Sequence, residues 1–206
     1  MKLSRFLLLT TLITGINILV IEALPSIIGQ QEMSAQEKKM MDQMMKYGTP
    51  GKGHDLLKKY VGDWNVDISS WPAPGAPVQM SKGTAKNQLI FEGRYVKCDF
   101  SGMMGGTNFT GLEVIGYDLF KKMYTTFWVD SMSTGFMITS GTLDMAGNVL
   151  TETGTSPDPM TDGKTMQKFK NVTTFMGDGK YKFEMYMVMP DGKESKGMEL
   201  VFTRKM

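Results

Sequence analysis

Two charged residues lie where strand-like, largely apolar runs begin or end, and they are the first candidates for contact with a ligand. Arg94 precedes one such run, and Asp130 ends another. An arginine that points into a cavity can hold a carboxylate head group with two hydrogen bonds. An aspartate at a strand end can line the mouth of the same cavity. For both residues, and for Glu152 on a third run, a structural ion pair or a turn cap is the alternative.

The chain has one cysteine, Cys98, and one histidine, His54. These counts exclude an intrachain disulfide framework, a zinc site built from cysteines and multi-histidine metal sites. Ser-His-Asp chemistry would have to use His54 as its base, and the sequence contains no G-x-S-x-G motif, phosphate loop or dinucleotide fingerprint. We therefore predict no catalytic residue, no metal site and no cofactor, and an enzyme is the less favoured class.

Methionine is unusually frequent, at 21 of 206 residues. Met185, Met187 and Met189 occupy alternate positions of one run, so their thioethers share one strand face. Soft thioethers suit copper(I), but methionine at every second position of a strand is more simply a row of core side chains. Copper handling is therefore a less favoured alternative. Haem would need an axial ligand, and His54 precedes the strands.

The N-terminus resembles a targeting segment. Lys2 and Arg5 precede a run without charge from Phe6 to Ile21. This run is short for a spanning helix, which needs roughly 20 residues, and is typical of an export signal. We predict a signal peptide over residues 1–23 and export to the periplasm or the extracellular space. An uncleaved N-terminal anchor is the alternative, and contact with a membrane is expected only through it.

The charge and composition of the chain indicate which classes of partner to expect. The chain has 23 basic and 21 acidic side chains, a net charge of +2, and no basic block, so a nucleic-acid partner is not expected. A hydrophobic fraction of 41% is enough to bury a core.

Residues 24–53 are expected to form a linker with one short helix. Ser34 and Glu37 have the spacing of a capping box, and methionines follow at helical spacing at positions 40, 41, 44 and 45. Residues 54–206 should form the main domain. From residue 63 on, the apolar period changes from 3.6 to 2, as in Trp64, Val66 and Ile68.

Further alternating runs begin at residues 123, 181 and 198. Turns rich in Gly and Asn separate the runs, which gives about ten strands. No long helical segment lies between them, so the strands should be antiparallel. An up-and-down barrel removes all sheet edges, and a two-sheet sandwich is the alternative. The side chains that we expect to line the interior and contact a ligand are Phe127, Met185, Met187 and Phe202.

The start and end of the domain resemble lipocalin-like (calycin) barrels. Gly62, Asp63 and Trp64 form a G-x-W motif at the start of the first strand, just after a short helix. In that group a basic residue near the end of the last strand packs over the tryptophan. The resemblance implies that Arg204 takes this structural role over Trp64.

A closer resemblance is to the bacterial family catalogued as domain of unknown function 1579, and it covers residues 54–205. The family has no established activity, so the resemblance implies a lipocalin-like fold and no catalytic residue. The stretches that carry the resemblance are 54–57, 62–64, 91–95, 111–118, 128–135, 191–194 and 202–205.

Together these observations predict an exported, all-β, ten-stranded lipocalin-like barrel with a short N-terminal helical segment. We expect it to bind a small apolar or amphipathic molecule in its interior, because alternate strand residues of apolar type would surround a shared space. The alternative is a structural or interaction module whose core is filled and takes no ligand.

Overall fold

A computed structural model describes residues 33–177 and 179–206 of the chain. The predicted signal peptide, residues 1–23, lies outside the described residues. The chain divides into two compact units, Met1–Lys46 and Tyr47–Met206. Within the described residues, the helices fall short of the length and hydropathy needed to cross a bilayer.

Helix α2, Ala35–Gly48, follows the predicted capping box. The backbone N–H of Ser34 donates to the Glu37 carboxylate at 2.7 Å, and the backbone N–H of Glu37 donates to the Ser34 hydroxyl at 3.3 Å. This reciprocal pairing satisfies amide groups that the first helical turn leaves without a partner. Met40, Met41 and Met44 are all exposed on this helix.

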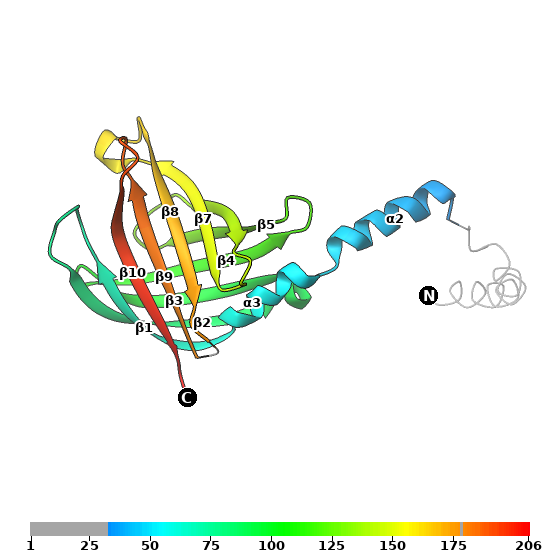
Figure 1. The fold of residues 1–206 in the computed structure, drawn as a ribbon, viewed down its shortest axis with the longest axis horizontal. Coiled ribbons are helices and arrows are strands. Elements are labelled where there is room, and N and C mark those ends of the chain that lie inside the picture. Colours follow the sequence, from blue (N-terminus) through cyan, green and yellow to red (C-terminus); the bar gives the residue numbers. More distant parts are fainter. Residues whose placement is uncertain (1–32, 178) are drawn as a thin grey trace, which may run out of the picture. The chain divides into compact units, whose positions relative to one another are not determined.

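Ten strands form one closed antiparallel barrel in which every strand pairs with its neighbours in sequence and β1 pairs with β10 (Figure 1). The predicted up-and-down barrel with a short N-terminal helical segment is therefore confirmed, and the two-sheet sandwich is wrong. The strands are β1 Gly62–Ser70, β2 Gln79–Ile90, β3 Tyr95–Met104, β4 Thr107–Asp118, β5 Met123–Asp130, β6 Met137–Leu143, β7 Val149–Pro157, β8 Met166–Phe175, β9 Lys180–Val188 and β10 Glu194–Arg204.

The turn between β6 and β7 shows how the sequence reverses the chain. Asp144 accepts hydrogen bonds from the backbone N–H groups of Asn148 and Val149 at 2.8 and 2.9 Å. Gly147 takes a φ of 75°, which other residues rarely adopt. The side chain and the glycine together fix a tight hairpin.

A short helix, α3 Asp55–Tyr60, closes one end of the barrel (Figure 1). Its Leu56, Leu57 and Tyr60 side chains are buried. The Tyr60 ring meets Phe175 and Tyr181 edge-on, with centroids 5.0 and 5.3 Å apart. This aromatic cluster plugs the end at which β1 begins.

Trp64 and Arg204 join the first strand to the last beside this plug. The guanidinium carbon of Arg204 lies 4.4 Å from the centre of the Trp64 ring, and its Nη1 donates to the carbonyl of Val61 at 2.8 Å. Gly62 has a φ of 137°, and a Cβ there would lie 2.1 Å from Nη1 of Arg204. The glycine of the G-x-W motif therefore leaves room for the guanidinium.

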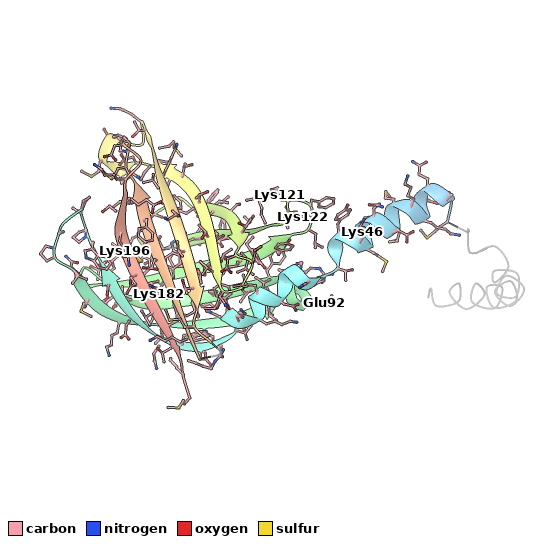
Figure 2. All side chains as sticks on the ribbon, in the orientation of Figure 1. Lys46, Glu92, Lys121, Lys122, Lys182 and Lys196 are labelled. Carbon is pink, nitrogen blue, oxygen red and sulfur yellow. The ribbon has the colours of Figure 1, made fainter. Side chains whose placement is uncertain are left out.

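The outer face of β9 and β10 carries a compact charge cluster (Figure 2). Glu184 pairs with Lys182 at 3.0 Å and with Lys196, and Lys196 also pairs with Glu199 at 2.8 Å. Burial of Glu184 opposes its charge, yet hydrogen bonds from Lys196 and Lys182 lower the pKa of this carboxyl to about 2.

Candidate functional site

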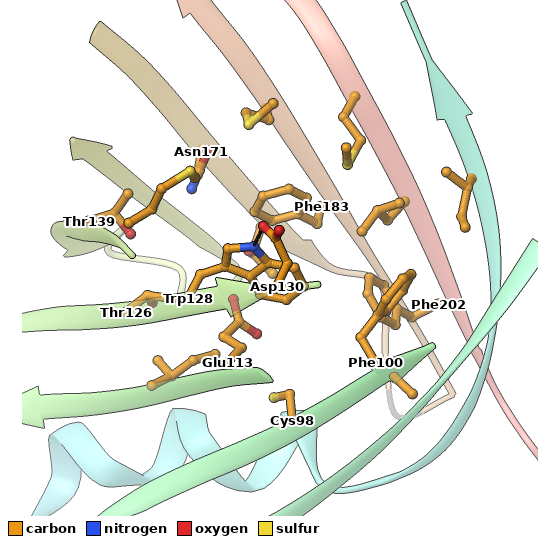
Figure 3. A pocket seen from close by; sticks show the side chains of 18 of the residues that line it. Cys98, Phe100, Glu113, Thr126, Trp128, Asp130, Thr139, Asn171, Phe183 and Phe202 are labelled. Carbon is orange, nitrogen blue, oxygen red and sulfur yellow. Dashed lines mark hydrogen bonds between the residues drawn. The ribbon is translucent and has the colours of Figure 1, made fainter. Parts of the chain in front are cut away.

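The barrel encloses a cavity of about 440 Å³, so its interior is hollow. Side chains from α3 and from strands on every side of the barrel form its wall (Figure 3). Most of this wall is apolar. The apolar and aromatic lining includes Ile68, Phe100, Phe109, Ile115, Phe183, Leu200 and Phe202.

Methionines are concentrated toward the end of the barrel opposite α3. Met104 ends β3, Met137 begins β6, and Met132 lies in the loop between β5 and β6. Met185 and Met198 form a pair on β9 and β10 and also line the cavity. Methionine side chains are flexible and polarizable, so this end of the wall can adapt to irregular molecules.

Glu113 is an acid on the wall of this otherwise apolar space. It lies on β4 between Cys98 of β3 and Trp128 of β5, its direct partners in the strand register (Figure 3). Burial, with the negative charge of Glu152 adding to it, raises the pKa of Glu113 to about 7. A hydrogen bond with the Cys98 thiol acts in the opposite direction. Glu113 therefore changes charge close to neutral pH.

Glu152 is a second acid on the wall, and it is buried on β7. Its Oε1 accepts hydrogen bonds from the hydroxyls of Thr126 at 2.8 Å and Thr139 at 3.3 Å. Burial raises the pKa of the carboxyl, and the two threonine hydroxyls limit that rise. Neutral donors thus hold this acid in place.

Two buried amide oxygens in the wall lack a hydrogen-bond partner among the described residues: Oδ1 of Asn87 and Oδ1 of Asn171. The Asn87 amide nitrogen donates to the carbonyl of Tyr60 at 3.0 Å and to the Tyr181 hydroxyl at 3.1 Å. Because a carbonyl can only accept, the orientation of the Asn87 amide is fixed and its oxygen remains an open acceptor.

Trp128 and Asp130 border the cavity near its methionine-rich end. The indole N–H of Trp128 donates to Asp130 at 2.8 Å. The other Asp130 oxygen accepts from the backbone N–H groups of Met132 and Ser133 at 2.9 and 3.0 Å. A Cβ on Gly111 would lie 2.1 Å from the Trp128 ring, so the glycine makes room for the indole.

Three of the residues predicted as ligand contacts line the cavity. Asp130 does so at the end of β5, Met185 on β9 and Phe202 on β10. Contact between these side chains and a ligand stays a prediction.

Arg94 does not line the cavity, so the expectation that its side chain points inward is wrong. Its Nε donates to the carbonyl of Gly48 at 2.8 Å, and its Nη1 donates to the carbonyl of Phe91 and to Glu92, both at 3.0 Å. Arg94 precedes the first residue of β3, in a corner where backbone carbonyls need donors. Arg94 therefore stabilises this corner of the backbone, and its guanidinium does not serve as an anchor for an anion in the cavity.

Phe127 and Met187 also lie outside the cavity wall. Tyr124, Thr126 and Trp128 take the inner face of β5, so Phe127 points outward and packs against Phe136 with ring centroids 5.5 Å apart. On β9 the wall reaches only to Met185. Met187 has the same parity as Met185 and lies two residues farther along β9, past the last residue of this strand that lines the cavity.

Sequence reasoning missed Glu113, Asn171 and Cys98 as wall residues. Glu113 lies in an apolar run in which both faces carry aliphatic residues, so alternation alone did not show which face is inside. Asn171 shares the parity of Phe169 and Thr173, which is the signal that could have placed it inside.

The single cysteine and histidine have different surroundings. Cys98 is buried in the cavity wall, and this burial raises the pKa of its thiol well above the usual range. His54 is buried outside the cavity, where its Nδ1 accepts from the backbone N–H of Gly51 at 3.1 Å. Within residues 33–177 and 179–206, the His, Cys, Asp and Glu side chains form no group of three that could hold a metal ion.

The fold and this site define a class: a small antiparallel β-barrel with a cavity that is plugged at one end by a helix. The chain belongs to the family described as protein of unknown function DUF1579, whose model matches residues 49–204. The matched range contains α3 and all ten strands. The resemblance identified from the sequence is therefore confirmed. Comparison with curated proteins finds no match.

Comparison with solved structures finds matches at low sequence identity. Rv2717c from M. tuberculosis matches with a TM-score of 0.52 and 10% identity, over 77% of this chain and 100% of that chain. A redesigned beta barrel matches with a TM-score of 0.37 and 15% identity, over 75% and 96% of the two chains. EF1p2_mFAP2b bound to DFHBI matches with a TM-score of 0.40 and 10% identity, over 75% and 100%. The likeness to Rv2717c supports the fold alone.

Proposed function

We propose that this protein binds a small, largely apolar molecule inside its barrel. The observation that carries the proposal is the cavity of about 440 Å³ with its aromatic, aliphatic and methionine wall. Cavities of roughly 300 to 1,000 Å³ are typical of small-molecule sites. Transfer of apolar surface from water into such a space contributes about 25 cal/mol per Å². The few polar groups on the wall would then orient the molecule.

We propose further that the protein acts outside the cytoplasm, in the periplasm or the extracellular space. Support for this comes from the sequence, in which Lys2 and Arg5 precede the apolar run 6–21. An uncleaved leader would instead anchor the barrel to a membrane. The N-terminal residue and mass of the protein purified from its own host would distinguish cleavage from anchoring.

The binding proposal is tested with N-phenyl-1-naphthylamine, a neutral dye that brightens in apolar surroundings. We expect saturable binding to the full chain. Met185→Trp places a large ring in the cavity wall and should weaken binding about tenfold or more, because the ring would occupy part of the space that the dye needs. Ile138→Trp adds a similar ring on the exposed outer face of β6 and should leave binding as in the wild type.

Two outcomes would overturn the proposal. One is an absence of saturable dye binding to the folded wild type. The other is equal binding by the Met185→Trp and Ile138→Trp variants, because the dye would then sit outside the barrel. Circular dichroism of each variant verifies that the barrel has folded. Failure would favour a structural module whose cavity is occupied by water.

A further inference from the structure

The charged side chains on the cavity wall are all acids, and two buried amide oxygens on the wall have no hydrogen-bond partner among the described residues. Among the described residues that line the cavity, three are acids, Glu113, Asp130 and Glu152, and none is Lys, Arg or His. An anionic head group would therefore meet repulsion inside the barrel. A ligand with a carboxylate head group, which an inward Arg94 would have favoured, is therefore not supported by the structure.

Three of the donors nearest the acids on the wall are already engaged. The Thr126 and Thr139 hydroxyls donate to Glu152, and the Trp128 indole donates to Asp130. Among the described residues of the wall, two buried acceptors have no hydrogen-bond partner, Oδ1 of Asn87 and Oδ1 of Asn171. Oδ1 of Asn171 is buried without a partner on a residue that is only 6% exposed, and Asn171 pairs directly with Glu152 across β7 and β8.

An unpartnered buried acceptor beside a buried acid needs a donor, and a donor from solvent or ligand has to reach it through the cavity. In the described part of the chain, the His, Cys, Asp and Glu side chains form no group of three that could hold a metal ion. An ammonium group fits the wall. It carries several N–H donors, and its positive charge complements carboxylates in a space of low dielectric constant.

We propose that the ligand of this barrel is an apolar molecule with a protonated amine, and that Glu113, Glu152 and Asn171 receive the amine head. The inference rests on the proposed function and names its ligand class. The apolar body would then extend along Phe183 and Leu200 toward the methionine-rich end. The pKa of Glu113, raised to about 7 by burial and by Glu152, supports the assignment, because a nearby cation would compensate this unfavourable crowding of acids.

The test compares three competitors that share one alkyl chain and differ only in the head group: decylamine, decan-1-ol and decanoate. Each displaces N-phenyl-1-naphthylamine from the full chain at pH 8, above the pKa of Glu113. We expect decylamine to bind about tenfold or more tightly than decan-1-ol, since hydrogen bonds to charged groups are the strong ones, and decanoate to bind most weakly.

Variants of the acids test the residues. Glu113→Gln and Glu152→Gln keep the side-chain shape and should each reduce the ratio of the decylamine affinity to the decan-1-ol affinity. The double variant should bring this ratio to about one, because no carboxylate remains at the head group. Glu92→Gln is the matched control, because Glu92 is 88% exposed at the corner before β3, and it should keep the wild-type ratio.

The outcomes separate the two proposals. Equal affinity for decylamine and decan-1-ol in the wild type, or a preference for decanoate, overturns the amine assignment while dye binding still supports an apolar site. An unchanged ratio in both single variants overturns the roles of Glu113 and Glu152. Failure of the dye and of all three competitors to bind overturns the proposed function itself. The wild-type comparison decides the head group even where a variant does not fold.

Discussion

The Thr126 hydroxyl donates a 2.8 Å hydrogen bond to Glu152 inside the barrel, on the same oxygen that receives the Thr139 hydroxyl. These neutral donors come from β5 and β6, and they orient a buried acid without neutralising it. Burial of Glu113 itself, and in second place the negative charge of Glu152, keep the pKa of Glu113 high. The cavity wall therefore holds two acids close together in apolar surroundings. This arrangement lowers the stability of the fold and can serve to recognise a ligand.

The first prediction concerns the pH dependence of stability through Glu113. Its pKa is about 7 in the folded chain and about 4.3 in an unfolded one. The folded state thus holds the proton more tightly, so this contribution to stability is fully present below pH ~4.3 and is lost as the pH rises through ~7. Urea unfolding should show wild type losing stability relative to Glu113→Gln between pH 5 and pH 8, by up to about 3 kcal/mol.

The comparison of the two proteins isolates Glu113 from every other titrating group. Glu92→Gln, at an exposed position, should follow the wild-type pH profile. A difference between wild type and Glu113→Gln that stays constant from pH 5 to pH 8 would contradict the raised pKa.

Much of the fold could be predicted because its signals are local and repeated. Trp64, Val66 and Ile68 alternate with polar residues, and turns such as Asp144–Asn148 reverse the chain after short runs. Ten such runs without a long helix lead to an antiparallel sheet, and edge closure leads to a barrel. The barrel follows from the sum of many consistent signals, so an error in one strand does not change it.

The polar wall could not be predicted in the same way, because it depends on which strand face is inside. On β5 both faces carry large apolar side chains, with Phe127 on one and Trp128 on the other. Glu113 faces the cavity inside the barrel, which contradicts the general rule that acids are found on the outer surface. Arg94 was expected inside and lies outside. Its guanidinium donates hydrogen bonds to the carbonyls of Gly48 and Phe91, and the sequence alone does not show that these carbonyls come together.

The second prediction concerns the charge cluster on the outer face of β9 and β10. Glu184 has a pKa of about 2 in the folded chain, below its unfolded value of about 4.3. Its stabilising contribution is present above pH ~4.3 and is lost as the pH falls through ~2. Glu184→Gln should therefore destabilise the barrel at pH 7 by on the order of 2 kcal/mol, because Lys196 loses a buried partner.

Urea unfolding at pH 7 and at pH 3 checks this prediction, and the deficit should shrink at the lower pH. A double-mutant cycle with Lys196→Met should give a coupling energy, since the two side chains are direct partners. Additive effects of the two substitutions would show that the pair contributes nothing.

The third prediction concerns the contact that joins the first strand to the last. Arg204→Met removes the cation over the Trp64 ring and the donor to the Val61 carbonyl. We expect a loss of about 1 kcal/mol in the free energy of unfolding, the magnitude of an exposed cation–π pair with one hydrogen bond. Lys205→Met is the matched control at the next residue and should have little effect. Equal losses in the two variants would assign the effect to net charge.

The fourth prediction links a glycine to the shape of the cavity. In Gly111→Ala the new Cβ would lie 2.1 Å from the Trp128 ring, so the indole must move and its hydrogen bond to Asp130 must lengthen or break. We expect a stability loss of about 1 to 3 kcal/mol from overpacking, a shift in tryptophan emission, and weaker binding of N-phenyl-1-naphthylamine. Gly135→Ala, in the loop that follows β5, has open space around its Cβ and should behave as wild type. Unchanged dye binding and emission in Gly111→Ala would show that the position of Trp128 does not shape the site.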